Sequence, residues 1–301
     1  MLDTIDFDIL KTLQKNCRTP LTKIAARHGL SSNAIKFRIS ELEKSGVIRG
    51  YHVFPSLGII NSTRIFCTSS VQHPIAEKKL LSVLREIEQV SSVGFLLDGS
   101  MYLFGLVTSN AEIPPLRRKI KALEELSNIQ FNIVKHEPRE CMELQYHHFQ
   151  ILEELVRDVR SPISTIAKNC GMTRKHVSEN INEMITNNAI FCTIDIDFLK
   201  GEHTLIILRI KWDPKNYSFT EILRRIESLF SELYWFNFIS TSKSEFYIAL
   251  YIPHIRDSFA IVQIVLDISG VTKVSVRVPI REYLFRHIEK EKLIELIEQN
   301  L

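Results

Sequence analysis

The sequence has no long apolar run and few cysteines, and both absences narrow the class of protein. Its 301 residues contain no stretch of about 18 apolar residues, which a membrane-spanning helix needs. The N-terminal run MLDTIDFDIL carries acids where a secretory signal would carry bases. The five cysteines lie far apart, with no CxxC and no Cys/His spacing of a zinc site. We therefore expect a cytoplasmic protein with reduced thiols and with no membrane partner, metal or cofactor.

Motifs that would indicate an enzyme are also missing. No Ser/His/Asp order, phosphate-binding loop or carboxylate pair with a defined spacing can be recognised in the sequence. The net charge of +3 is too small to indicate nucleic acid by itself, because a whole-chain balance can hide a basic face on one domain. The distribution of charge along the chain therefore has to show whether one domain could bind nucleic acid.

An internal repeat organises the chain. A shift of 142 positions aligns residues 5–56 with 147–198 without a gap and gives 12 identities in 52 positions. The identities are mostly apolar and turn residues, which a shared fold would retain. Each copy is followed by the order strand, helix, two strands, helix, strand. This order folds most simply as an antiparallel four-stranded sheet with both helices on one face.

The repeat predicts an α+β protein of two tandem units, each a winged helix-turn-helix followed by a ferredoxin-like βαββαβ domain. The expected domains are 1–55, 56–140, 141–198 and 199–301, with a linker between the halves at 138–145. The run 283–300 predicts an extra C-terminal helix, which either mediates oligomerisation or caps the second sheet. Its apolar stripe would be Leu284, Ile288, Ile294, Ile297 and Leu301.

The first copy has the spacing of a DNA-reading helix-turn-helix. Helix one is expected over 6–15, a short second helix follows Pro20, and Gly29 supplies the tight turn. Ser31 is a suitable N-cap for helix three, which buries Ile35, Ile39 and Leu42. Residues 49–54 would form a wing strand beside the DNA backbone, and residues 5–56 carry a net charge of +5. The residues expected to contact DNA are Lys23, Ser32, Asn33, Lys36, Phe37, Arg38, Ser40 and Arg49.

The second copy retains the apolar positions but not this charge. Residues 147–198 carry a net charge of −2, and Ser178, Glu179 and Asn180 replace the residues aligned at 36–38. A weak second DNA contact remains open at the start of its third helix, through Arg174, Lys175 and His176. The alternative is a domain that serves packing or pseudo-dimer symmetry, which we favour.

The run IDFDILKTLQKNCRTPLTKIAARHGLSSNAIKFRISELEKSGVIRGYHVFPS strongly resembles the N-terminal domain of Lrp/AsnC transcription regulators. The resemblance implies sequence-specific binding of double-stranded DNA and self-association through the α/β domains. It also implies a possible effector site in the turn between the middle two strands, here Asp98, Gly99, Ser100 and Tyr102. The acid usual in that family falls on Tyr102, so a plain β-hairpin turn is the preferred interpretation.

Two other classes of function stay open beside a non-enzymatic regulator. The two-domain architecture also resembles siroheme decarboxylases, in which histidines and arginines handle a tetrapyrrole. The candidate groups for such an enzyme are His52, His136, His147, His148 and Arg209. A pure assembly protein that uses the C-terminal helix is the third possibility.

Overall fold

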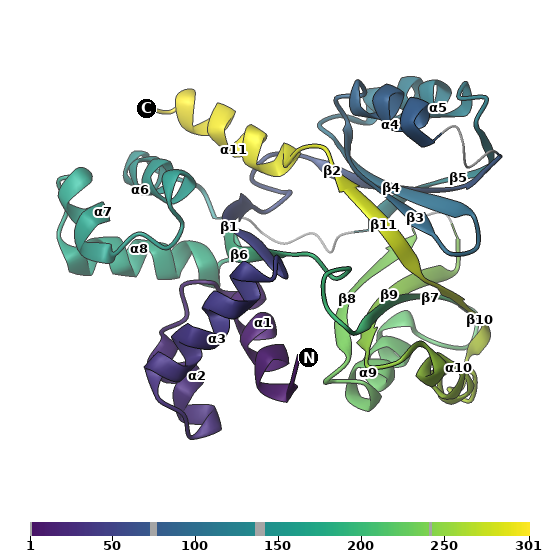
Figure 1. Ribbon diagram of the computed structural model, residues 1–301. Coiled ribbons are helices and arrows are strands. Elements are labelled where there is room, and N and C mark those ends of the chain that lie inside the picture. The colour runs from purple at the N-terminus through teal and green to yellow at the C-terminus, as the bar shows by residue number, and fades with distance from the viewer. Residues whose placement is uncertain (1, 73–76, 136–141, 241–242) are drawn as a thin grey trace. The chain divides into compact units, whose positions relative to one another are not determined.

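The computed structural model describes residues 2–72, 77–135, 142–240 and 243–301 (Figure 1). His136 and residues 138–141 of the expected linker lie outside the described residues. Two compact units divide the chain. One holds residues 1–62, 137–200 and 287–301, and is called here the helix-turn-helix unit. The other holds residues 63–136 and 201–286, and is called the sheet unit. Within the described residues, no helix is long and apolar enough to cross a bilayer.

The helix-turn-helix unit contains both copies of the repeat. The first consists of α1 (Thr4–Lys15), α2 (Leu21–His28), α3 (Ser32–Lys44) and β1 (Ile48–Pro55). The second consists of α6 (Tyr146–Arg157), α7 (Ile163–Asn169), α8 (Arg174–Thr186) and β6 (Ile190–Ile196). The predicted stripe of α3 is buried, and so are the equivalent Val177, Ile181 and Met184 of α8. The aligned apolar positions of the two copies are therefore buried in the same way.

Strand β1 pairs with β6 of the other copy in an antiparallel two-stranded sheet. Polar contacts reinforce the junction. The Arg18 guanidinium donates to the carbonyl of Val159 at 2.5 Å, and the Arg160 guanidinium lies 4.5 Å from the Tyr51 ring centroid. Arg18 and Arg160 are an identical pair of the repeat, so both copies use the same arginine to hold the other copy. The sequence analysis did not assign this role, although their identity was the available signal.

The sheet unit confirms the ferredoxin-like order in both halves. The first half is β2 (Thr63–Val71), α4 (Glu77–Arg85), β3 (Val90–Leu96), β4 (Ser100–Val107), α5 (Ile113–Lys121) and β5 (Leu126–Lys135). The second is β7 (Thr204–Trp212), α9 (Phe219–Leu229), β8 (Tyr234–Ser240), β9 (Glu245–Ile252), α10 (Ser258–Leu266) and β10 (Val271–Arg277). In each half the two helices contribute to one core with their sheet. Aromatic residues of both halves, including Phe66 and Tyr247, form a further core.

One continuous sheet runs through both halves in the order β10-β7-β9-β8-β5-β2-β4-β3-β11. Strand β11 (Pro279–Leu284) follows β10 after a single residue and pairs with β3 of the first half. Neighbouring segments of the chain thus supply both end strands.

The C-terminal helix differs from its prediction in bounds and in place. Helix α11 spans Ile288–Glu298, because residues 283 and 284 belong to β11. It packs against β1 and α6, so the prediction that it caps the second sheet was wrong. Its buried residues are Ile288, Leu293 and Ile297, whereas Leu284 and Leu301 of the predicted stripe are exposed.

Candidate nucleic-acid interface

Helix α3 is positioned by a glycine turn and a serine cap. Gly29 ends α2 with φ of +62°, a left-handed conformation that a residue without a Cβ adopts at little cost. The hydroxyl of Ser31 then accepts the backbone N–H of Ala34 at 3.1 Å, which satisfies one free donor of the first turn. With Ile35 and Ile39 buried, the opposite side of α3 is fixed toward solvent.

Three of the predicted contact residues share that outward side. Asn33, Lys36 and Phe37 are exposed, and Phe37 keeps 65% of its surface accessible. Lys36 forms no ion pair with any carboxylate of the described residues. Ser32 and Ser40 are half-buried beside these residues, and Lys23 is exposed on α2. A cation, an amide and an aromatic ring therefore stand together on an unpaired helix face.

Arg38 has a contact that the sequence analysis did not foresee. Its Nη1 lies 2.8 Å from a carboxylate oxygen of Asp3 and 2.8 Å from one of Asp6, at the start of α1. Partial burial raises the pKa of Asp3, but the Asp6 backbone N–H and the Arg38 guanidinium outweigh it and lower that pKa overall. Arg38 therefore ties α3 to α1. Its contact with DNA stays a prediction, for which Asp3 and Asp6 are competing partners.

Arg49 is likewise held inside the protein. Its Nη2 lies 2.8 Å from Asp195 Oδ1, and its Nε donates to Asp195 Oδ2 at 3.0 Å. Such a two-pronged pair is the strong form of arginine–carboxylate contact. Because Asp195 lies on β6, the predicted wing strand joins the two copies. The contact of Arg49 with the DNA backbone likewise stays a prediction, for which Asp195 is a competing partner.

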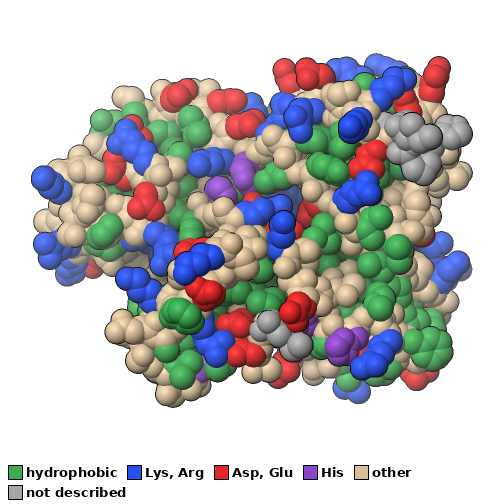
Figure 2. All heavy atoms as spheres, viewed as in Figure 1, with side chains coloured by type: hydrophobic (Ala, Val, Ile, Leu, Met, Phe, Trp, Pro, Cys, Tyr) green, Lys and Arg blue, Asp and Glu red, His purple; other side chains and the backbone are tan. Residues whose placement is uncertain are grey.

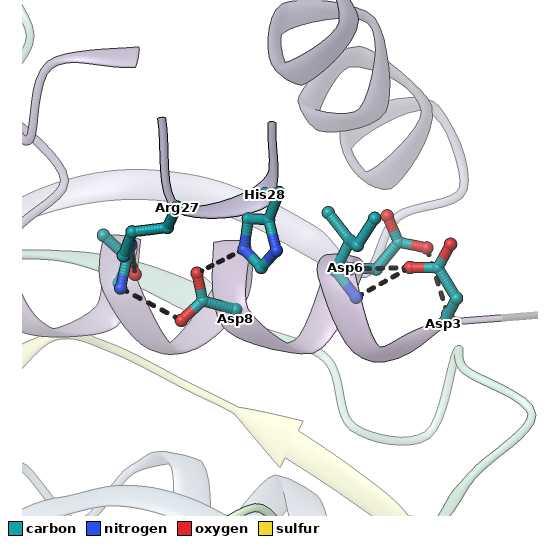
Figure 3. A network of polar contacts seen from close by, with 7 residues as sticks. Asp3, Asp6, Asp8, Arg27 and His28 are labelled. Atoms are coloured by element: carbon teal, nitrogen blue, oxygen red, sulfur yellow. Dashed lines mark hydrogen bonds and ion pairs between the residues drawn. The ribbon is translucent and has the colours of Figure 1, made fainter. Parts of the chain in front are cut away.

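Other charges of the first copy are also paired internally. Figure 3 shows Asp8 of α1 approached from α2 by Arg27 and His28, at 3.1 and 2.8 Å. The net charge of +5 therefore overstates what is free for a phosphate backbone. Lys23 and Lys36 are the predicted basic contacts that keep their exposure without an ion pair among the described residues.

The second copy presents a different outward face. Glu179 takes the place of Phe37 and lies 3.9 Å from Lys175, which reduces the free charge of that lysine. Asn180, at the position of Arg38, is buried and donates to the His176 carbonyl at 2.7 Å. Arg174 and His176 are exposed. Figure 2 shows basic side chains at the outer edge near α7 and α8, so some positive surface remains there.

The possible effector turn is closed by its own contacts. Gly99 has φ of +76° between β3 and β4, and the exposed Asp98 accepts the backbone N–H of Ser100 at 3.0 Å. The Ser100 hydroxyl also accepts from Arg277 Nη1 at 3.1 Å. Tyr102 is only 3% exposed and belongs to the aromatic core of the sheet unit. The Asp98–Ser100 bond and the positive φ of Gly99 are those of a hairpin turn, and Arg277 of β10 adds a contact from the second half.

The groups named for a tetrapyrrole enzyme are distributed over both units. Arg209 on β7 is paired with the buried Glu245, with Nη2 to Oε2 at 2.6 Å. The rings of His147 and His148 contact each other at a tilt at the start of α6, with centroids 4.1 Å apart. His148 is buried, and this burial lowers its pKa and keeps the ring neutral. His52 lies on β1, close to Asp195 and His287.

The fold and the exposed face of α3 define a helix-turn-helix protein, and the comparisons agree. The family of winged helix-turn-helix DNA-binding domains matches residues 2–49. The proline dehydrogenase transcriptional activator of Rhodobacter capsulatus is 31% identical over 106 residues, which cover 34% of this chain and 69% of that relative. The regulatory protein AsnC of Haemophilus influenzae is 27% identical over 149 residues, 46% of this chain and 93% of the relative. The chain belongs to the Lrp/AsnC family of transcription regulators.

The relatives match only part of this chain, and the chain spans less than two thirds of several of them. For two further regulators of the helix-turn-helix type, the match covers 61% and 38% of their length. The crystal structure of the siroheme decarboxylase NirDL matches over 99% of both chains with a TM-score of 0.57 and 13% identity. At that identity the likeness concerns the fold of the whole tandem chain.

Proposed function

We propose that this protein binds double-stranded DNA as a regulator of transcription and that the first helix-turn-helix makes most of the contact. The exposed Phe37, beside the unpaired Lys36 and Asn33 on α3, is the observation that carries this proposal. A ring that contributes nothing to the core has a use in a major groove, where it can touch a thymine methyl. Asn33 can pair with adenine, and Lys36 and Lys23 can bind phosphates.

The second copy is proposed to make at most a supporting contact. An exposed acid, Glu179, would face the phosphates with the wrong sign, whereas Arg174 and Lys175 at the start of α8 could still reach them. The sheet unit is proposed to mediate self-association, as the family resemblance implies.

The proposal is tested by selecting bound genomic fragments with the full chain and measuring affinity for one of them by gel shift across a salt series. We expect Lys36→Ala with Phe37→Ala to weaken binding by roughly 10- to 100-fold. The loss of one lysine should also reduce, by about one, the slope of the logarithm of the binding constant against the logarithm of the salt concentration. The matched control is Ser178→Ala with Glu179→Ala at the aligned positions, which should not weaken binding.

Arg174→Ala with Lys175→Ala should have a smaller effect than the first pair. A larger loss from this second pair would mean that the two copies were assigned the wrong way round. Failure of the unmodified chain to bind any duplex at low salt would contradict the proposed function.

An enzymatic function of the siroheme decarboxylase kind is the second candidate, favoured by the match over 99% of both chains. The pairing of Arg209 with Glu245 speaks against a free arginine for substrate carboxylates there. An absorbance shift of an added iron tetrapyrrole, reduced by Arg209→Ala and seen without duplex binding, would favour this candidate over the regulator.

A further inference from the structure

Three potential metal ligands from distant parts of the sequence meet in the helix-turn-helix unit. They are His52 on β1, Asp195 on β6 and His287, the N-cap of α11. One ligand atom of each residue lies within 4.8 Å of one ligand atom of each of the others. The two histidine rings are 4.5 Å apart between centroids. Among the described residues this is the one group of three such side chains that is close enough to share an ion.

The strand register explains why His52 and Asp195 meet. Gly50 pairs with Asp195 and His52 pairs with Thr193, so both ligands project from the same face as diagonal neighbours. Gly50 has no side chain opposite Asp195, and a Cβ there would come within 3.2 Å of His52 Nε2. The glycine therefore leaves the space that the imidazole occupies.

The chemical state of His52 suits a ligand. Its Nδ1 is buried and has no hydrogen-bond partner in the described structure, a condition that is rare for buried polar atoms and calls for an explanation. Imidazole nitrogens are the commonest metal ligands in proteins, and a nitrogen without a hydrogen-bond partner can offer its lone pair to an ion.

We propose that His52, Asp195 and His287 bind a divalent first-row transition metal ion such as Zn²⁺. Two imidazoles and one carboxylate form a donor set that proteins use for zinc and for non-haem iron, with positions left for water or a further ligand. Metal–nitrogen bonds of about 2.0 Å require the three side chains to close in by rotation. All three are only partly buried, so such rotation is possible.

The surrounding charges are mixed rather than repulsive. Arg49 and Lys290 lie near the histidines, but Asp195 and Asp197 both contact Arg49, and Glu289 and Glu291 stand in the first turn of α11. Arg49 would act as the outer partner that orients the Asp195 carboxylate, as hydrogen-bonded neighbours of metal ligands commonly do.

The proposed site occurs once because the two copies differ at it. Ile194 of the second copy is aligned with His52, and Val53 of the first copy is aligned with Asp195. Helix α11 follows the second half and has no counterpart after the first half. A bound ion would tie α11 to the sheet that joins both helix-turn-helix copies. The site thus gives the helix-turn-helix unit a metal-dependent junction.

The site is tested on the full chain after treatment with a chelator, by titration with Co²⁺ followed by ligand-field absorption and by competition with Zn²⁺. We expect one Co²⁺ per chain and a shift of thermal unfolding to higher temperature with Zn²⁺. His52→Gln and His287→Asn should each weaken binding by roughly tenfold or more. Asparagine is a good N-cap, so the second variant keeps the start of α11.

His147→Gln is the matched control, because it removes an imidazole from the other histidine group of the same unit. Unchanged binding in both ligand variants would overturn the proposal, as would loss of binding in this control alone or the absence of Co²⁺ binding to the unmodified chain. Circular dichroism verifies that the variants fold. The metal measurement does not depend on DNA, so its failure is distinct from failure of the proposed function.

Discussion

The two helix-turn-helix copies differ far more on their surfaces than in their cores. Ile35, Ile39 and Leu42 of α3 are buried, as are Val177, Ile181 and Met184 of α8. The outward positions instead carry Lys36 and Phe37 in one copy and Ser178 and Glu179 in the other. Folding requires the apolar positions in both copies, whereas a groove requires the polar ones only where DNA is bound.

The link between helices one and three also differs between the copies. In the first it is ionic, from Arg38 to Asp3 and Asp6. In the second the aligned positions hold Asn180, Gln145 and His148. The buried Asn180 bonds within α8 to the His176 carbonyl, and His148 of α6 lies 4.0 Å from a carboxylate oxygen of Glu183 on α8. The aligned positions are thus polar in both copies, but those of the second copy do not reproduce the ionic link of the first.

The largest expected effect tests whether the cores are equivalent. Leu13 and Leu155 occupy aligned positions and are 0% and 1% exposed. Leu13→Ala and Leu155→Ala should each lower the free energy of unfolding by about 3 kcal/mol, because each leaves a cavity. Urea denaturation followed by circular dichroism measures both. A difference of more than about 2 kcal/mol between them would show that the copies are not packed alike.

Much of this fold follows from sequence because it depends on local periodicity. The apolar spacing and the Gly29 turn locate α1 to α3, and the repeat transfers them to α6 to α8. The order of strands and helices likewise predicts the ferredoxin-like halves. Each helix or strand in these patterns is encoded within about 15 neighbouring residues.

Contacts between distant residues could not be predicted in this way. The pairing of β1 with β6 fixes the partner of Arg49 at Asp195, and nothing in the local sequence of either residue indicates it. The same pairing brings His52 to Asp195, and α11 adds His287. A search for metal-ligand spacing along the sequence therefore finds no site, because the three ligands come from three separate segments.

A medium effect is expected from breaking the ionic link of the first copy. Arg38→Met should lower the free energy of unfolding by about 1.5 kcal/mol at pH 7, because it leaves Asp3 and Asp6 without their cation. The matched variant Asn180→Leu removes the aligned polar contact of the second copy without removing a charge. Urea denaturation of both variants measures the two costs.

The cost of Arg38→Met should depend on pH. The pKa of Asp3 is lowered in the folded state from its usual 3.8, so its stabilising contribution is present above pH 3.8. The contribution is lost as the pH falls through the lower folded value. The difference between the unmodified chain and Arg38→Met should therefore shrink toward pH 2, whereas Asn180→Leu should show no such convergence. A pH-independent cost of Arg38→Met would contradict the ionic origin of the link.

The smallest expected effect is a gain of DNA binding in the second copy. Ser178→Lys with Glu179→Phe places the outward residues of α3 on α8, where Glu179 is exposed and its backbone carries no special strain. Removing one acid and adding one lysine should strengthen duplex binding about tenfold, or about 1.4 kcal/mol, and steepen its salt dependence. The control Ser178→Gln with Glu179→Gln removes the acid without adding a cation or a ring. If the grafted chain gains no more than this control, then α8 does not approach DNA, and the second copy serves only to pair β6 with β1 and to support α11.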